Sequence, residues 1–456
     1  MAAWMTAFMT TSINIALPSI QTEFSLGAVA LGWLPLAYTL ASAAFLLPFA
    51  TIGDRFGRRF VFLLGLSLFA VSSTALVFAD SYAPLVIFRV TQGLGGSMMF
   101  STSMAMVTLA YPPERRGWAM GISVAAAYLG MTTGPILGGV IVHNIGWRSL
   151  FLITACFAFF NLGLDLWLLR RAEWKEQTTT GFDWIGSLLY AGALSAILLG
   201  LPWIPLTRGI ALVVAGLCGM ALLLWWEART PNPVIEVRLF LHNRVFTLSN
   251  LTALISYASV WAYTYLMSLY LQFIKGLDAQ TAGAVLVAGV ALQCLLAPFG
   301  GRLSDRIEPR WVASGGMFLC VVGLFLFSFL QADTPYWYVV LALCVLGVGY
   351  AFFSGPNQSA IMGSVERRYV GFASASISTV RMVGMAVSTA LATLIMALIV
   401  GRHDMEPADY PNLLQAIQLT FAIFTGVCAL SVLASLVRGK MPGHDAPMKV
   451  QTRDGV

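Results

Sequence analysis

Charged residues are scarce in this chain. Its 456 residues are 10% charged and 58% hydrophobic, and the mean hydropathy is +0.80. A soluble domain carries about a quarter charged residues, so this composition excludes a soluble protein. The six cysteines form no close pair, and the four histidines fall in predicted loops or the tail. A disulfide scaffold and a histidine metal cluster are therefore not expected, and the composition is typical of a polytopic membrane protein.

Acidic residues are almost absent from the long apolar segments. Asp165 is the only acid within a predicted span, and it lies close to the end of that span. An integral-membrane enzyme would need His, Asp or Glu residues clustered at one depth, and the short glycine pairs lack the lysine of a nucleotide loop. We therefore predict that the protein is not an enzyme and uses no cofactor or metal.

Long apolar segments occur fourteen times between residues 1 and 437. About 20 apolar residues suffice for a helix to cross a bilayer, so each segment predicts one transmembrane helix. Lys and Arg cluster in alternate loops, with twenty in one set and four in the other. The positive-inside rule places the basic loops and both termini in the cytoplasm. Membrane orientation, and not nucleic-acid binding, therefore explains the net charge of +6.

An internal repeat divides the chain. The stretch around Asp54 resembles the stretch around Asp305 at an offset of 251, and Glu114 matches Glu366 at an offset of 252. Two matches at nearly one offset predict a duplicated six-helix half. The expected organisation is an N-terminal bundle at 1–170, a linker with two extra helices at 171–245, a C-terminal bundle at 246–437 and a cytoplasmic tail at 438–456.

The most glycine-rich apolar stretch lies in the first half. Gly130, Gly134 and Gly138 are four residues apart, so in a helix they share one face and permit another helix to approach closely. Pro135 removes one backbone donor and is predicted to bend the helix. Gly139 follows directly. This face serves either tight packing alone or movement of one helix against another.

Two arginines fall inside predicted spans. Arg89 lies near one end of its span and Arg381 near mid-depth. An ionisable residue within a bilayer is costly, so each is a candidate for function. Arg89 either bonds to backbone carbonyls as a structural residue or takes part in coupling or substrate contact, and the same alternatives apply to Arg381. A buried arginine can bind an anion through two parallel hydrogen bonds.

Three motifs resemble those of one transporter family. The loop GDRFGRR at 53–59, the stretch RVTQGLGG at 89–96 and the glycine pattern at 121–139 are similar to the signature loop, the buried-arginine motif and the antiporter motif of the major facilitator superfamily. With fourteen spans, the chain resembles the drug:proton antiporter branch. This resemblance implies an all-α major facilitator fold of two six-helix bundles plus an inserted two-helix hairpin, working as an exporter driven by the proton gradient.

One position departs from that pattern. The branch usually carries an aspartate nine residues before the proline of Ala16-Leu17-Pro18, and here the position is Met9. In the branch this aspartate carries the proton and attracts cations. Its replacement makes neutral, zwitterionic or anionic amphipathic cargo more plausible than the resemblance alone implies.

The site predictions combine the motifs, the repeat and the buried charges. The predicted coupling or gating residues are Asp54, Arg55, Arg58, Arg89, Gly130, Gly134, Pro135, Gly138, Gly139, Asp305 and Arg381. Polar and aromatic residues within spans are expected to face a central cavity, although each could instead join helices to one another. The predicted substrate contacts are Asn14, Tyr38, Arg89, Gln92, Tyr128, Tyr257, Trp261, Gln293, Asn357 and Gln358.

The leading functional hypothesis is a proton-coupled exporter of small amphipathic compounds or drugs. The expected partners are the substrate, protons and the lipid bilayer, with no nucleic acid, and the protein is expected to be a monomer in the bacterial cytoplasmic membrane. The alternatives are an uptake symporter, an exporter of an anionic metabolite or lipid, and a non-transporting membrane sensor with the same fold.

Overall fold

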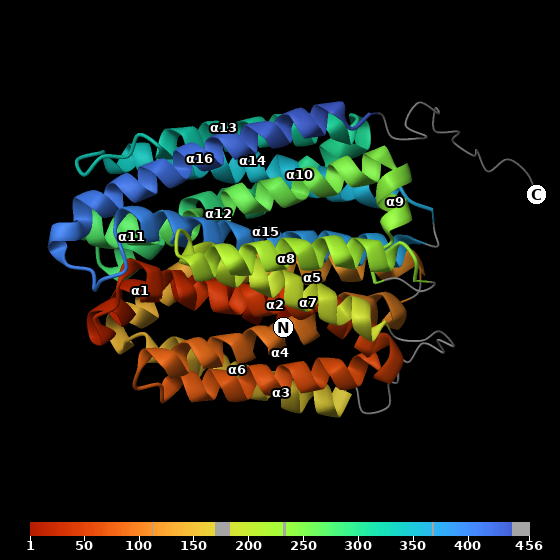
Figure 1. The fold of residues 1–456 in the computed structure, drawn as a ribbon, viewed down its shortest axis with the longest axis horizontal. Helices are drawn as coiled ribbons and strands as arrows, with labels where there is room; N and C mark the ends of the chain where they lie inside the picture. Colours follow the sequence, from red (N-terminus) through yellow and green to blue (C-terminus); the bar gives the residue numbers. More distant parts are fainter. Residues whose placement is uncertain (112, 169–182, 231–233, 367–368, 440–456) are drawn as a thin grey trace, which may run out of the picture.

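The computed structural model describes the chain except residues 112, 169–182, 231–233, 367–368 and 440–456, and except the side chains of 108, 113–118, 305 and 370. In the described part the regular structure is helical (Figure 1). The long helices are α1 (Ala2–Phe24), α2 (Ala28–Phe56), α3 (Arg58–Val77), α4 (Tyr82–Ala110), α5 (Pro113–Ile145), α6 (Arg148–Leu168), α7 (Trp184–Gly200), α8 (Thr207–Glu227), α10 (Arg244–Val260), α12 (Ala279–Arg306), α13 (Pro309–Phe327), α14 (Tyr336–Gly363), α15 (Val370–Ile399) and α16 (Tyr410–Val437). The short elements are η1 (Leu201–Trp203), α9 (Val237–His242), α11 (Tyr263–Leu269), η2 (Tyr270–Ile274) and η4 (Pro407–Asp409).

Membrane-spanning length is common to these helices. In the described residues, twelve helical segments are long and apolar enough to cross a bilayer. Helices α1 and α4 have 23 and 29 residues and pack within the bundle, α1 against α5 and α4 against α3 and α2. Predicted buried polar positions lie on both helices, Asn14 on α1 and Arg89 and Gln92 on α4. The prediction of an all-α polytopic fold is confirmed.

The two repeated halves meet through equivalent pairs of helices. Helix α12 packs against α5, and α2 packs against α15. Gly283 on α12 lies against the backbone of Pro135 on α5, and Gly32 on α2 lies against Thr393 on α15. Gly32 and Gly283 are separated by the repeat offset of 251. Glycine at both positions permits close approach of the helices, so the repeat seen in the loops extends to the interface between the halves.

Helices α7 and α8 form a hairpin outside the two halves. They pack against each other, and α7 also contacts α2 and α15 (Figure 1). The Tyr190 hydroxyl donates to the carbonyl of Ala43 on α2 at 3.1 Å. Asp183 caps the start of α7 by accepting from the Gly186 N–H at 2.8 Å. The hairpin therefore lies along the α2–α15 side of the interface.

The segment Arg244–Ile274 is long and apolar enough for one membrane crossing, but it is not one continuous helix. The helix breaks at Trp261 and Ala262 between α10 and α11, and η2 is a π-helical turn. At the break, the Ala262 N–H bonds to the Ser388 hydroxyl on α15 at 3.0 Å. Within a bilayer a freed backbone donor needs such a partner. The break is thus stabilised by a residue more than a hundred positions away, which local sequence does not reveal.

The two ends of the bundle differ in how the halves meet. We call the end with the loops at 25–27, 275–278 and 400–406 the sealed end, and the end with the loops at 57 and 307–308 the basic end. On the sealed side the Ser268 hydroxyl donates to the Asn14 carbonyl at 2.6 Å, and Gln21 donates to the Met405 carbonyl at 3.1 Å. The Asn14 carbonyl is available because Pro18 has no N–H to offer it. On the basic side Gly121 and Gly371 are exposed, and a Cβ added at either would meet no atom within 4 Å.

Candidate substrate cavity

A cavity of about 130 Å³ lies between the two halves. Helices α1, α2, α4 and α5 contribute its wall on one side, and α10, α12, α14 and α15 contribute the other. It reaches Gln358, five residues before the end of α14 on the basic side. The wall is mainly aromatic and thioether in character, and its side chains include Phe100, Tyr128, Met131, Tyr257, Trp261, Tyr350, Met382 and Met385.

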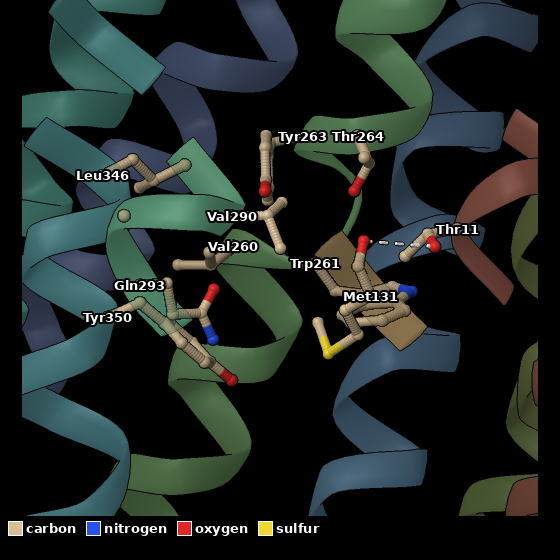
Figure 2. Close-up of a pocket in the computed structure, with 11 residues that line it drawn as sticks. Thr11, Met131, Val260, Trp261, Tyr263, Thr264, Val290, Gln293, Leu346 and Tyr350 are labelled. Carbon is tan, nitrogen blue, oxygen red and sulfur yellow. Dashed lines mark hydrogen bonds between the residues drawn. The ribbon is translucent and has the colours of Figure 1, made fainter. Parts of the chain in front are cut away.

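A smaller cavity of about 30 Å³ adjoins it (Figure 2). The two cavities share Met131, Trp261, Gln293 and Tyr350 as lining residues. In Figure 2, Gln293 and Tyr350 lie on one side, and Met131 and Trp261 lie on the other. The break after α10 therefore places Trp261 where both cavities meet.

Six of the ten predicted substrate contacts line the larger cavity. They come from both halves, so residues far apart in the sequence meet at one place. These six are Tyr38, Tyr128, Tyr257, Trp261, Gln293 and Gln358.

Arg89 does not line the larger cavity, and its guanidinium bonds to two groups of the protein. Its side chain is 1% exposed. Its Nε donates to the Leu34 carbonyl at 3.1 Å, its Nη1 donates to Gln92 at 2.5 Å, and its guanidinium lies 4.8 Å from the centre of the Tyr38 ring. Arg89 lines only a third cavity of about 10 Å³, together with Asn14. This arrangement favours the structural alternative for Arg89.

Gln92 and Asn357 also lie outside the larger cavity. Gln92 is held between Arg89 and the Ser73 hydroxyl, to which it donates at 2.8 Å. Asn357 donates to the Ser249 carbonyl at 3.1 Å and accepts from Arg438 at 2.9 Å. Both side chains are buried. Their hydrogen bonds join helices within one half. Joining helices was the alternative to substrate contact in the sequence analysis.

The glycine face of α5 has two different neighbours. Gly130 lies against the backbone of Trp4, Gly134 lies against Thr11, and Gly138 lies against Ser12, all on α1. Gly139 instead lies against the backbone of Ala279 on α12, in the other half. Helix α5 is therefore packed tightly on both sides, once within its half and once across the interface.

Pro135 also affects the contact between α5 and α1. Because proline lacks an N–H, the carbonyl of Met131 loses its helical partner. The Thr11 hydroxyl of α1 lies 3.5 Å from that carbonyl (Figure 2). The neighbouring helix thus offers a donor at the point where α5 lacks one.

Arg381 lines the larger cavity and is half-buried. Its Nε is buried without a hydrogen-bond partner. In the part of the chain that the structure describes, no carboxylate forms an ion pair with it. Its environment therefore differs from that of Arg89 in both solvent access and bonding.

The signature loop at 53–59 contains one close ion pair. Asp54 at the end of α2 accepts from Arg58 Nε at 2.6 Å, across a turn in which Gly57 has a φ of 108°. Arg55 lies over the ring of Phe56 at 5.8 Å. The side chain of Asp305, the predicted counterpart of Asp54 in the second half, lies outside the described residues.

Met9 points away from the cavity. It is 1% exposed, and its sulfur lies 3.4 Å from the Thr154 hydroxyl on α6. The α1 residues that line the larger cavity are Ala3, Ala7 and Thr10. A carboxylate at position 9 would therefore lie between α1 and α6 in this conformation.

Sequence reasoning missed several residues of the wall. Tyr350, Ser354, Met382 and Met385 line the larger cavity. Tyr350 and Ser354 are four residues apart on α14, and Gln358 follows after four more, so these three share one helical face. That spacing could have extended the prediction from Gln358 to its two neighbours.

This geometry defines a class of protein: a polytopic helical membrane protein whose helices, from early and late in the chain, enclose a cavity. The comparisons with known proteins give the particular family. The sequence model of the Major Facilitator Superfamily matches residues 1–389 and, separately, 249–452. The chain belongs to the major facilitator superfamily, whose members are transporters.

Related sequences carry several transport names. The riboflavin transporter RibZ of Clostridioides difficile is 29% identical over 378 residues, which cover 83% of this chain and 82% of that protein. The multidrug resistance protein Stp of Mycobacterium tuberculosis is 31% identical over 391 residues, covering 84% and 72%. The tetracenomycin C resistance and export protein of Streptomyces glaucescens is 28% identical over 402 residues, covering 87% and 74%.

A solved structure supports the fold. A bacterial homolog of the human lysosomal transporter Spinster, in an inward-facing and unoccupied conformation, has a TM-score of 0.65 and 18% identity, covering 96% of this chain and 94% of that chain.

Proposed function

We propose that the protein exports small amphipathic compounds by alternating access, in exchange for protons. The observation that carries this proposal is the cavity between the halves, lined mainly by aromatic and methionine side chains and bounded on the sealed side by contacts between the halves. Such a wall can hold organic molecules of varied shape, because methionine and aromatic side chains adapt to irregular surfaces. The glycine pattern of α5 supports export over uptake.

The names of the relatives support a small organic cargo. Two are named for drug resistance or export and one for riboflavin transport. The excess of Lys and Arg in the loops of the basic end supports a cytoplasmic location for that end and for both termini. In that orientation the cavity would receive its cargo from the cytoplasm. We propose the bacterial cytoplasmic membrane as its location and a monomer as the working unit.

Transport by the purified protein in liposomes tests this proposal. We expect an imposed pH gradient to drive amphipathic compounds outward from the basic side, and a protonophore to stop that movement. Met131→Trp would fill the point shared by both cavities, so we expect it to slow transport at least tenfold. Leu129→Trp is the matched control, because Leu129 lies two residues away on α5 and is 55% exposed on the outer surface.

The outcomes separate the candidate functions. Movement of protons and cargo in the same direction would contradict antiport and indicate an uptake symporter. Transport no faster than in empty liposomes for every compound would contradict transport altogether. Equal slowing by both tryptophan variants would show that the cavity is not the route.

A further inference from the structure

The larger cavity has one source of formal charge. In the described residues that line it, Arg381 is the only charged side chain, and the others are aromatic, aliphatic, thioether, hydroxyl or amide groups. A guanidinium keeps its charge at any physiological pH. A ligand in this cavity therefore meets one fixed positive charge and no fixed negative charge from the described residues.

Arg381 also has unused bonding capacity. A guanidinium has five N–H donors in a planar fork, and a buried charge normally needs partners to offset its lost hydration. Arg89 satisfies this need with the Leu34 carbonyl and Gln92. Arg381 Nε has no partner although it is buried. The partner that fits a free guanidinium fork is a carboxylate, sulfonate or phosphate group.

The aromatic wall beside Arg381 indicates the rest of the ligand. Tyr257 and Tyr350 form an edge-on pair with ring centres 5.8 Å apart. Tyr128 on α5 faces the same cavity from the other half. Aromatic side chains bind planar rings by offset or edge-on stacking. The cavity thus combines an anion-binding group with surfaces that suit a ring.

We infer that the cavity binds planar aromatic compounds that carry an anionic group, with Arg381 binding the anion and Tyr128, Tyr257 and Tyr350 contacting the ring. The inference rests on the proposed function only in treating this cavity as the cargo site. The inference specifies that the cargo is anionic, whereas the exporter proposal does not specify the charge of the cargo.

Binding to the purified full-length protein tests the inference with three naphthalene compounds that share the ring and carry a negative, a neutral or a positive substituent. These are naphthalenesulfonate, naphthalenesulfonamide and naphthyltrimethylammonium, measured by equilibrium dialysis with gluconate as the sole other anion. We expect the sulfonate to bind at least tenfold more tightly than the ammonium compound. Arg381→Gln removes that preference, and Arg381→Lys keeps part of it because it retains the charge but not the planar fork. Arg229→Gln is the matched control, since Arg229 is exposed on the hairpin.

Several results would overturn the inference. Equal binding of all three compounds by the wild-type protein is one, and it needs no variant to fold. A sulfonate preference that survives in folded Arg381→Gln is another. If chloride at moderate concentration displaces the sulfonate completely and the sulfonamide does not bind, the ring surfaces play no part and the site is a simple inorganic anion site.

Transport of the same compounds separates this inference from the proposed function. Selective binding of the sulfonate without its transport supports the anion site and contradicts the exporter. Transport of all three compounds at equal rates supports the exporter and contradicts the anion site.

Discussion

The two halves of this transporter share an architecture but place their buried arginines differently. Arg89 of the first half lies among protein partners and is 1% exposed. Arg381 of the second half faces the cavity with its Nε unpartnered. At the repeat offset of 251, the position equivalent to Arg381 is Gly130, which packs against α1. The comparison shows that burial alone does not identify a functional charge: the decisive property is whether the protein has already used its donors.

The first prediction tests the structural role of Arg89. Arg89→Ala removes the added bond to the Leu34 carbonyl, leaves the Gln92 oxygen without its donor and creates a void, so we expect a loss of stability of about 2–5 kcal/mol. Thermal unfolding of the purified protein measures this loss. Naphthalenesulfonate binding by the folded fraction is expected to be unchanged. A stable variant that no longer binds the sulfonate would reverse the assignment of the two arginines.

The second prediction concerns Gly130, the first-half position that the repeat offset matches to Arg381. Gly130→Ala places a methyl group against the backbone of Trp4 on α1, and we expect a destabilisation of about 1–3 kcal/mol from overpacking. Gly121→Ala on the same helix is the control, because nothing lies within 4 Å of its added methyl. Equal melting temperatures for the two variants would mean that the α1–α5 contact tolerates separation.

The third prediction concerns the seal between the halves. Ser268→Ala removes the bond to the Asn14 carbonyl, which costs about 0.5–1.5 kcal/mol only while the halves are in contact there. The equilibrium is then expected to move roughly 2- to 10-fold toward separation of the sealed end. Distances between spin labels at residues 144 and 332 measure this shift.

A matched serine serves as the control for the seal. The hydroxyl of Ser259 bonds only to the Ile255 carbonyl of its own helix, so Ser259→Ala is expected to leave the label distances unchanged. If both serine variants shift the distances equally, the Ser268 bond has no special role in closure.

The smallest expected effect concerns the loop between α2 and α3. Asp54→Asn weakens a partly exposed ion pair with Arg58, so we expect a stability loss of only about 0.2–1 kcal/mol. The prediction that Asp54 is a coupling or gating residue implies that transport falls much more than stability does. Asp80→Asn, in an exposed loop at the other end, is the control. If stability and transport fall in the same small proportion, the loop has no role in gating and serves only to orient the helices in the membrane.

Sequence predicted the fold well because hydropathy and the repeat act over whole helices. The twelve segments of the described residues that are long and apolar enough to span a bilayer follow from hydropathy, and the close approach at Gly134 follows from glycine spacing and residue size. The partners of buried polar groups depend instead on tertiary packing. Nothing near Arg89 in the sequence identifies the Leu34 carbonyl as its acceptor, and nothing near Trp261 marks a helix break that Ser388 stabilises.

The residues that line the cavity could be predicted only in part. Tyr128, Tyr257 and Gln293 could be placed in the cavity because a polar group within a span avoids lipid. The same argument applied to Asn357, whose amide instead joins α10 and α14. Polarity predicts that a side chain faces protein, and only the fold decides between a cavity and a neighbouring helix.

An experimental density map of the protein with bromonaphthalenesulfonate bound tests the account most directly. The bromine marks the ring and the sulfonate marks the charge. We predict sulfonate oxygens within hydrogen-bond distance of the Arg381 guanidinium and the ring among Tyr128, Tyr257 and Tyr350. A sulfonate bound beside Arg89, or a ring in the larger cavity with its sulfonate directed away from Arg381, would contradict the account.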